Sequence, residues 1–450
     1  MESIVSLLTW PRVIAAILVY YGTLIFYRLF LHPLARFPGP KLAAISRWYE
    51  GYFDLVQGGQ YTRKIALLHN EYGPIVRISP HEVHVNDPAF FDKLYRLDGR
   101  WDKHAWMYEA FGAKSSTVFG VDHDAHKARR HAIAPFFSRP KVSARQHILR
   151  QNVDKLAARV STLAGSGTAF NLGAAISAFT RDVTNEFITG KAYNELELDD
   201  FGIDLSIASQ GAGVFWRTTK FIRWFGPSIR AIPIDWALKM ADEGTKSFLN
   251  FLKQSEQDAR DTLAAALASS SEDTMIHAIV NSNLSPADKT FDHVFEEVAT
   301  VTGAGYETTA NALRLIVYHV FSDKTILKRL RDEITSAAAT APDPIPLTTL
   351  EQLPYLTAVL TEGMRLSPGI SCRAGRVTDK DLFYRDWRIP AGTPVGMTAL
   401  LLHTDDKLYP DPMRFDPTRW LDSEGRRAEP DNKPVYAPFS RGTRMCLGMQ

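Results

Sequence analysis

Residues 439–448 read FSRGTRMCLG, which has the form F-x-x-G-x-R-x-C-x-G. A thiolate that binds a metal needs positive potential and backbone amide donors around its sulfur, and glycines let the chain turn tightly beneath a flat macrocycle. The pattern predicts Cys446 as the iron ligand of a haem, with Arg444 paired to a propionate, Phe439 shielding the sulfur and Gly442 at the turn. The alternative is a buried structural cysteine in a glycine-rich turn, and five matching positions at fixed spacing argue against it.

The composition is that of a globular chain. Of its 450 residues, 45% are hydrophobic and 23% are charged, which is enough to bury a large core. The 52 basic and 50 acidic residues nearly cancel, so there is no basic surplus of the kind that binds nucleic acid through its phosphates. A disulfide framework would need more cysteines than Cys372 and Cys446, so a reducing compartment is favoured. Cys372 is predicted to be a small core residue.

The first thirty residues differ from the rest. Residues 13–27 form an uncharged and largely apolar run, and the apolar character extends over residues 4–31. A helix of that length can cross a hydrocarbon core of ~30 Å. We therefore expect residues 1–31 to form a transmembrane anchor. A cleaved signal peptide is the alternative, but no small-x-small cleavage site follows the run before Arg28.

The charges around this run predict its orientation. Arg28, Arg36 and Lys41 follow the apolar run, whereas Glu2 precedes it. By the positive-inside rule, the bulk of the chain then lies in the cytosol. The low cysteine content agrees with that compartment.

After the anchor, the pattern predicts one mainly helical body with a small sheet, over residues 32–450. The sequence RFPGP at 36–40 has two prolines around a glycine and predicts a stiff, extended hinge. Residues 73–78 and 82–85 alternate in polarity, which predicts two short strands joined by a turn. The Ala- and Ser-rich stretch 263–271 could be a mobile connection or ordinary helix. From about 140 to 340 the pattern is helical, with breaks expected at Gly165–Gly167, Gly226-Pro227, Ile232-Pro233 and Ser285-Pro286.

Together these features resemble the cytochrome P450 family, and the resemblance extends from the N-terminal anchor to the last residue. It implies a mainly α fold with small β-sheets behind a transmembrane helix. It also implies haem b (iron protoporphyrin IX) as the cofactor, O2 as a co-substrate, and electrons from NADPH delivered by a membrane-bound reductase. The implied function is that of a monooxygenase.

A possible charge network lies further upstream. Glu362 and Arg365 form an E-x-x-R motif, which on a helix places the acid and the base on one face. Residues 415–420, FDPTRW, look like the family segment whose arginine joins this pair. The resemblance therefore implies a buried triad of Glu362, Arg365 and Arg419 with a structural role. The alternative is an ordinary surface ion pair, worth under about 1 kcal/mol.

Residues 304–309, AGYETT, lie within an apolar pattern from about 291 to 321 that predicts a long helix. Ala304, Glu307 and Thr308 fall at i, i+3 and i+4, so they share one face. The stretch resembles the family's A/G-G-x-D/E-T signature, in which the glycine loosens the helix to admit dioxygen and the acid and hydroxyl relay protons. The resemblance assigns these roles to Gly305, Glu307 and Thr308. Alternatively, Thr308 bonds back to the carbonyl four residues earlier and Glu307 faces water.

Further cofactor contacts follow from the resemblance. Residues 122–130, DHDAHKARR, correspond to the segment where many family members have W-x-x-x-R directed at a haem propionate. His126 takes the tryptophan position and Arg130 keeps the donor, so His126 could bond the propionate or only pack. Arg376 sits where the family often supplies another propionate arginine. Either arginine could instead be surface charge.

Two segments are candidates for the substrate pocket. Residues 101–121 are aromatic and contain glycine, as expected of a loop over the distal haem face. Residues 214–236 carry aromatic and basic side chains, a mixture suited to an entrance that dips into the membrane. Core packing explains the second segment equally well. Both segments favour a lipophilic substrate.

Three stretches, 32–41, 72–80 and 129–138, are similar to fungal microsomal members of secondary metabolism that resemble trichodiene oxygenases. That resemblance implies a terpenoid-like substrate. It also implies attachment to the endoplasmic reticulum membrane, with the catalytic domain facing the cytosol.

The C-terminal end departs from the family pattern. Cys446 is followed only by residues 447–450, whereas the family's cysteine normally opens a long helix, and several dozen further residues complete the proximal wall. The sequence therefore leads us to expect a truncated product or a remnant. The alternative function, from a different class, is a catalytically silent relic or a membrane-attached, partner-binding scaffold.

Overall fold

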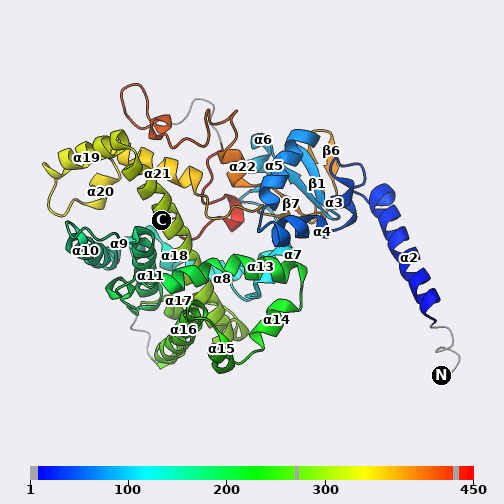
Figure 1. Ribbon diagram of the computed structural model, residues 1–450, viewed down its shortest axis with the longest axis horizontal. Helices are drawn as coiled ribbons and strands as arrows, with labels where there is room; N and C mark the ends of the chain where they lie inside the picture. Colours follow the sequence, from blue (N-terminus) through cyan, green and yellow to red (C-terminus); the bar gives the residue numbers. More distant parts are fainter. Residues whose placement is uncertain (1–8, 269–272, 429–434, 450) are drawn as a thin grey trace. The chain divides into compact units, whose positions relative to one another are not determined.

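The computed structural model describes residues 9–268, 273–428 and 435–449 (Figure 1). Its contacts divide the chain into two compact units. The first unit comprises residues 1–94, 99–104 and 372–398, and the second comprises residues 95–98, 105–371 and 399–450. The catalytic domain predicted over 32–450 therefore contains parts of both units.

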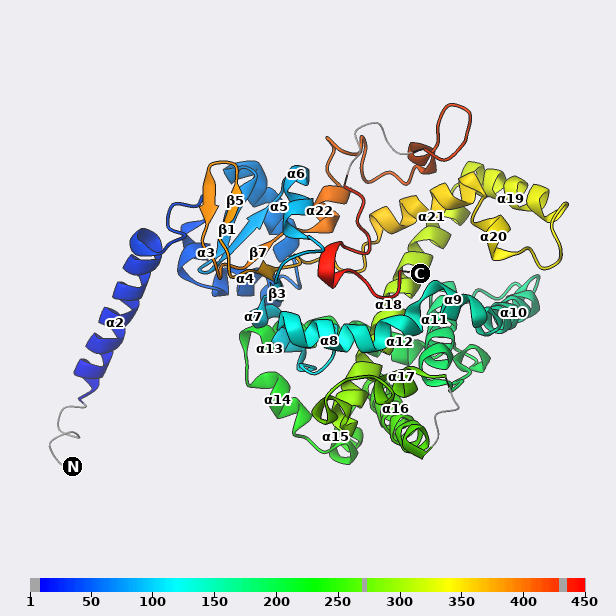
Figure 2. The same ribbon diagram turned by 180° about the vertical axis from the view of Figure 1, so that it is seen from behind.

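The N-terminal helix of the first unit is α2, Trp10–Phe26, which continues through a π-helical turn, Tyr27–Leu31. Pro11 lies in its first turn, where the missing N–H is not needed. The 22 residues from Trp10 to Leu31 are long and apolar enough to cross a membrane. Figures 1 and 2 show α2 extending away from the rest of this unit. The part of the predicted anchor before residue 9 lies outside the described residues.

The predicted hairpin begins a five-stranded sheet with the strand order β1-β2-β7-β4-β3. Strand β1, Ile75–Ser79, pairs antiparallel with β2, Glu82–Val85, so the two predicted strands are confirmed. Strand β2 pairs in parallel with β7, Val395–Gly396. The sheet continues antiparallel through β4, Arg376–Val377, to β3, Asp102–Lys103. Chain segments more than 270 residues apart thus share one sheet.

The remaining elements of the first unit are short. A second sheet is the hairpin of β5, Leu382–Tyr384, and β6, Trp387–Ile389. The helices of this unit after the anchor are α3 (Lys41–Ile45), α4 (Trp48–Gly51), α5 (Tyr61–Tyr72) and α6 (Pro88–Leu94).

The predicted hinge at 36–40 packs on strand β1. The backbone N–H of Arg77 donates to the carbonyl of Pro38 at 2.7 Å. Gly39 has φ +150°, and a Cβ at this position would lie 2.5 Å from the carbonyl oxygen of Arg77. Only glycine allows so close an approach. Arg36 lies in a turn, and Phe37 and Gly39 lie in bends, so the segment is less extended than expected. The hydrogen bond between Arg77 and Pro38 ties it to the sheet.

The second unit is built from helices around α18, Phe291–Ser322, which confirms the long helix predicted from about residue 291. Helix α11, Leu172–Thr189, packs along α18. The other helices of this unit are α7 (Ala105–Tyr108), α8 (His123–Ile133), α9 (Arg139–Ala144), α10 (Gln146–Leu163), α12 (Ile203–Gln210), α13 (Ala212–Phe221), α14 (Phe225–Arg230), α15 (Ile234–Met240), α16 (Glu243–Ala268), α17 (Met275–Val280), α19 (Lys324–Ala338), α20 (Leu347–Leu350), α21 (Pro354–Leu366) and α22 (Ala399–His403).

Most of the predicted helix breaks are confirmed. Gly165–Gly167 lies between α10 and α11, Ile232-Pro233 lies between α14 and α15, and Ser285-Pro286 follows α17. The break predicted at Gly226-Pro227 is wrong. Both residues lie in the first turn of α14, where a proline leaves no intrahelical hydrogen bond unmade. Helix α16 includes residues 263–268, and residues 269–271 of the predicted connection lie outside the described residues.

The predicted charge triad is present and buried. Arg365 donates two hydrogen bonds to the Glu362 carboxylate, at 2.8 and 2.7 Å, and Nε of Arg419 lies 3.4 Å from the same group. The indole N–H of Trp420 adds a further bond to Glu362 at 3.0 Å. Glu362 and Arg365 are fully buried, so the alternative of a surface ion pair is wrong. The triad joins α21 to residues 416–420.

Candidate functional site

The turn that carries Cys446 requires glycine at one position. Gly442 begins a short 3-10 helix, Gly442–Arg444, with φ +78°, and a Cβ there would lie 2.5 Å from the carbonyl oxygen of Arg96. The backbone N–H of Thr443 donates to that same carbonyl at 3.1 Å. The N–H of Cys446 then donates to the Phe439 carbonyl at 2.9 Å, which closes the loop. The sulfur is thus presented from a turn held at both ends.

Cys446 is a free and exposed cysteine. Partial desolvation raises the pKa of its thiol, while the N–H of Gly448 and the positive charge of Arg130 act in the opposite direction. Arg130 also donates to the Met445 carbonyl at 2.8 Å. Among the described residues, no group of three His, Cys, Asp or Glu side chains could hold a metal ion. A single accessible thiol with a neighbouring arginine fits a metal whose other ligands come from a macrocycle.

Arg444 is buried, and its side chain donates hydrogen bonds to backbone carbonyls. Its two terminal nitrogens donate to the carbonyls of Gly120 and Val121, both at 2.8 Å. The sequence assigns a contact with a haem propionate to the same guanidinium. That assignment stays a prediction.

The other predicted cofactor residues have different surroundings. His126 is buried in α8, whereas Phe439 is exposed. Arg376 lies in β4 of the first unit, where it is buried and donates to the Gly375 carbonyl at 3.3 Å. The contacts of these three residues with a cofactor therefore stay predictions.

Helix α18 presents Ala304 and Thr308 on an exposed face. The Thr308 hydroxyl donates to the Ala304 carbonyl at 2.9 Å, which is the back-bonded arrangement weighed as the alternative. In this rotamer the hydroxyl is bonded to the backbone, and a rotation about χ1 breaks that bond. The structure thus places Ala304 and Thr308 on one exposed face, whereas Glu307, the third residue predicted for this face, is only partly exposed.

Gly305 is turned toward α11. A Cβ at this position would lie 2.8 Å from the methyl group of Thr184, so glycine allows the two helices to approach closely. Helix α18 runs through this position without a break. Close helix packing is thus the observed use of Gly305, and the predicted opening of the helix for dioxygen stays a prediction.

Glu307 points into a partly buried, positively charged environment. Its Oε1 atom is buried without a hydrogen-bond partner. Burial raises the pKa of Glu307, and the charges of Arg314 and Arg181 partly oppose that shift. Arg314 donates to the Gly173 carbonyl at 3.3 Å and to the Ser177 hydroxyl of α11. Sequence reasoning missed both arginines, although charges within apolar helix patterns were a usable signal.

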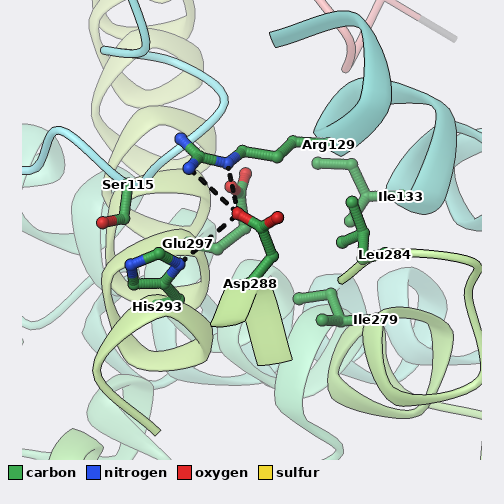
Figure 3. Close-up of a pocket in the computed structure, with 8 residues that line it drawn as sticks. All are labelled: Ser115, Arg129, Ile133, Ile279, Leu284, Asp288, His293 and Glu297. Carbon is green, nitrogen blue, oxygen red and sulfur yellow. Dashed lines mark hydrogen bonds and ion pairs between the residues drawn. The ribbon is translucent and has the colours of Figure 1, made fainter. Parts of the chain in front are cut away.

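A second acidic site on α18 was also missed (Figure 3). Glu297 is 5% exposed and accepts from the N–H and the hydroxyl of Thr117 at 2.7 and 3.0 Å. Its other oxygen has no partner, and burial raises the pKa of Glu297 to about 7. It lines a small pocket where Arg129 and His293 both point at Asp288. Glu297 thereby holds the 113–120 segment on α18.

We expect Glu297→Gln to change how stability depends on pH. Because the folded protein raises the pKa of Glu297 from 4.5 to about 7, its stabilising contribution is present below pH 4.5 and is lost as the pH rises through 7. The wild-type protein should lose about 3 kcal/mol over this window relative to the variant. Denaturant unfolding of both proteins between pH 4.5 and 8 measures the difference, and parallel curves would contradict it.

The two segments predicted to form the substrate pocket pack against each other. The indole N–H of Trp216 donates to the Met107 carbonyl at 2.9 Å, and its ring stacks on Phe111 with centroids 5.1 Å apart. The ring of Phe119 also stacks on Phe111, with centroids 4.0 Å apart. Arg230 donates to the Gly112 carbonyl at 2.9 Å. Residues 105–121 and 212–230 therefore form one aromatic cluster within the second unit.

The cysteine turn is joined to the long helix through Leu447, which packs on a core cluster that includes Ile133 of α8 and Val294 and Val298 of α18. An accessible thiol on a glycine turn, beside a long helix that carries an acid and a hydroxyl, defines the class of haem-thiolate oxygenases.

Comparison with known proteins agrees with this class. A family model described as cytochrome P450 matches residues 45–450. The cytochrome P450 monooxygenase tpcC of Cochliobolus heterostrophus is 37% identical, over 96% of this chain and 83% of its own length. The cytochrome P450 monooxygenase TRI4 of Fusarium sporotrichioides is 32% identical, over 97% and 84%. The tryptophan 6-hydroxylase fscE of Fusarium equiseti is 35% identical, over 94% and 83%.

The chain therefore belongs to the cytochrome P450 family, and it is an oxidoreductase of the monooxygenase type. Membership implies a haem iron cofactor. Three predictions are thereby confirmed: the family recognised from residues 439–448, the mainly helical fold with small sheets, and the monooxygenase class.

Proposed function

We propose that this chain takes electrons from NADPH through a membrane-bound reductase and hydroxylates or epoxidises a lipophilic secondary metabolite, with terpenoids as the first class to test. Family membership supports the type of reaction. The observation that carries the proposal lies within the second unit, where an exposed thiol at Cys446 and an acid and a hydroxyl on α18 are held in one packed framework.

We further propose that the chain is held at the endoplasmic reticulum by one N-terminal span, with its body in the cytosol. Helix α2 and the basic residues after it support this placement. Exposed apolar side chains on α14, α15 and the turn before them also favour contact with lipid, namely Trp224, Ile229, Trp236 and Met240.

The chain's own residues have separate roles in this proposal. When bound through Cys446, haem supplies the redox chemistry that activates dioxygen. Burial raises the pKa of Glu307, which favours the protonated form of this carboxyl relative to a free glutamate. Thr308 presents a hydroxyl on the exposed face of the same helix turn, within one residue of that acid. In this proposal the two groups hold a proton and pass it on.

Product analysis tests the proposal. The chain is combined with a family reductase, NADPH and haem, and is offered terpenoids and, because one relative is a tryptophan 6-hydroxylase, indole derivatives. We expect a product that is one oxygen atom heavier than a terpenoid substrate. Oxidation of indoles alone would overturn the substrate class, and NADPH-independent or absent turnover would overturn the reaction.

Thr308→Ala should uncouple oxygen consumption from product formation, because the variant lacks the hydroxyl beside Glu307. We expect the yield of product per NADPH to fall by about tenfold or more; positioned proton donors typically contribute about 10²- to 10⁴-fold. Thr308→Ser, which keeps the hydroxyl, should restore most of the coupling. Thr309→Ala is the matched control one residue away. An unchanged peroxide yield in Thr308→Ala would contradict the assignment.

A further inference from the structure

Two arginines and two histidines gather where the apolar N-terminal helix meets the rest of the first unit. Arg28 lies in the π-helical turn that ends the anchor, and His32 follows it. Arg77 comes from strand β1, and His81 comes from the turn after it. The guanidinium of Arg77 donates to the backbone carbonyl of Arg28 at 2.8 Å, and the rings of His32 and His81 lie 5.3 Å apart. We call these four residues the junction cluster.

The two arginines of the junction cluster are only partly satisfied by the protein. Arg77 is 2% exposed and donates to the carbonyls of Arg28 and Pro80, while Arg28 donates to the carbonyl of Ile45. The Nε atoms of both arginines are buried without a hydrogen-bond partner. Neither arginine has an ion pair with a carboxylate in the part of the chain that the structure describes. A buried donor without an acceptor is costly, and two uncompensated charges add to that cost.

The electrostatics of the junction cluster favour a negative charge. Burial first, and then the neighbouring Arg28, lower the pKa of Arg77 to about 10. Burial and then Arg77 lower the pKa of His32 to about 4, and burial and then Arg47 do the same for His81. Nδ1 of His32 accepts from the N–H of Leu34 at 3.0 Å, so Nε2 of the neutral ring carries the proton and can donate.

The position of the junction cluster identifies the anion. The cluster lies at the C-terminal end of the apolar helix, with Arg28 in its last turn and His32 directly after Leu31, and lipid phosphates lie at that level when the helix spans a bilayer. A phosphodiester offers several acceptor oxygens and one negative charge, which suit guanidinium N–H donors. We propose that the junction cluster binds the phosphate of an anionic phospholipid. This inference rests on the proposed membrane anchoring.

Lipid retention in the full chain tests the site. The protein is reconstituted with phosphatidylcholine and phosphatidylserine, extracted in mild detergent with 0.5 M salt to screen diffuse attraction, and its retained lipid is counted by native mass spectrometry. We expect one phosphatidylserine per wild-type chain. Arg28→Gln should lower this retention about fivefold, equivalent to about 1 kcal/mol. Arg36→Gln, which removes an exposed charge from the same segment, should leave it unchanged.

The outcomes separate the possible sources of error. Equal losses in Arg28→Gln and Arg36→Gln would mean diffuse attraction and would overturn the site. If millimolar inorganic phosphate displaced the lipid, the site would bind free phosphate, and our assignment of a lipid phosphate would be overturned. If Arg28→Gln fails to fold by circular dichroism, Arg28→Lys, which keeps the charge but lacks Nε, must still lower retention. A chain that does not float with phosphatidylcholine vesicles overturns the anchoring itself, whereas one that floats but retains no phosphatidylserine overturns only the site.

Discussion

Cys446→Ser should abolish the strongly red-shifted Soret band that we expect from the reduced, carbon-monoxide-treated protein loaded with haem. A thiolate donates electron density to the iron, and a serine hydroxyl stays protonated at neutral pH and cannot replace it. The turn itself should survive, because its hydrogen bonds come from the backbone of Cys446, Thr443 and Met445. The expected effect is therefore complete loss of the thiolate signature in a folded chain.

Cys372→Ser is the matched control for this experiment. Cys372 is the other free cysteine; it lies in the first unit and is far from the turn in sequence. This variant should keep the red-shifted band at full intensity. If the band persisted in Cys446→Ser and disappeared in Cys372→Ser, Cys372 would be the iron ligand and our assignment to Cys446 would be wrong. Absence of the band in the wild-type chain under the same haem loading would contradict the thiolate assignment altogether.

Glu362→Gln should destabilise the second unit by about 3 to 5 kcal/mol, the usual cost of breaking a buried charge network. The Glu362 carboxylate accepts from Arg365, from the indole of Trp420 and from the N–H of Asp416, with Arg419 close by. Glutamine removes the negative charge and turns one acceptor into a donor that faces other donors. Arg365 would then remain buried as an unpaired cation.

Denaturant unfolding of the full chain measures this loss, and Asp332→Asn provides the comparison. Asp332 pairs with Lys328 across one turn of α19 at 2.6 Å, but both side chains are exposed. Breaking that pair should cost less than about 1 kcal/mol. Similar losses of unfolding free energy in the two variants would show that the buried triad stabilises the protein no more than an exposed ion pair does.

Local signals made much of the fold predictable. The apolar pattern gave α18 to within a residue, and alternation over residues 73–85 gave the β1–β2 hairpin. The position of Cys446 follows from a short pattern whose glycine is required by a contact within the same unit. The break at Gly226-Pro227 was predicted wrongly because a proline in a first helical turn has the same sequence pattern as a proline between helices.

Contacts between distant segments were not predictable. Arg373 binds Glu50 and Glu82 in a fully buried cluster, and the partners lie 323 and 291 residues away in sequence. Glu297 holds Thr117 across 180 residues. In both cases the charged residues alone have the pattern of surface charges, and only the folded backbone brings the partners together. For the same reason the arginines around Glu307 were missed.

The double hydrogen bond from Arg444 to the carbonyls of Gly120 and Val121 has a practical consequence for protein engineering. It fixes the register between two stretches of chain more than 320 residues apart. Consider a chimera in which a relative supplies the C-terminal fifth and this chain supplies the residues before α8. Its arginine would come from one parent, and the two carbonyls would be positioned by the other. Crossover points should therefore transfer residues 116–122 and 439–448 together.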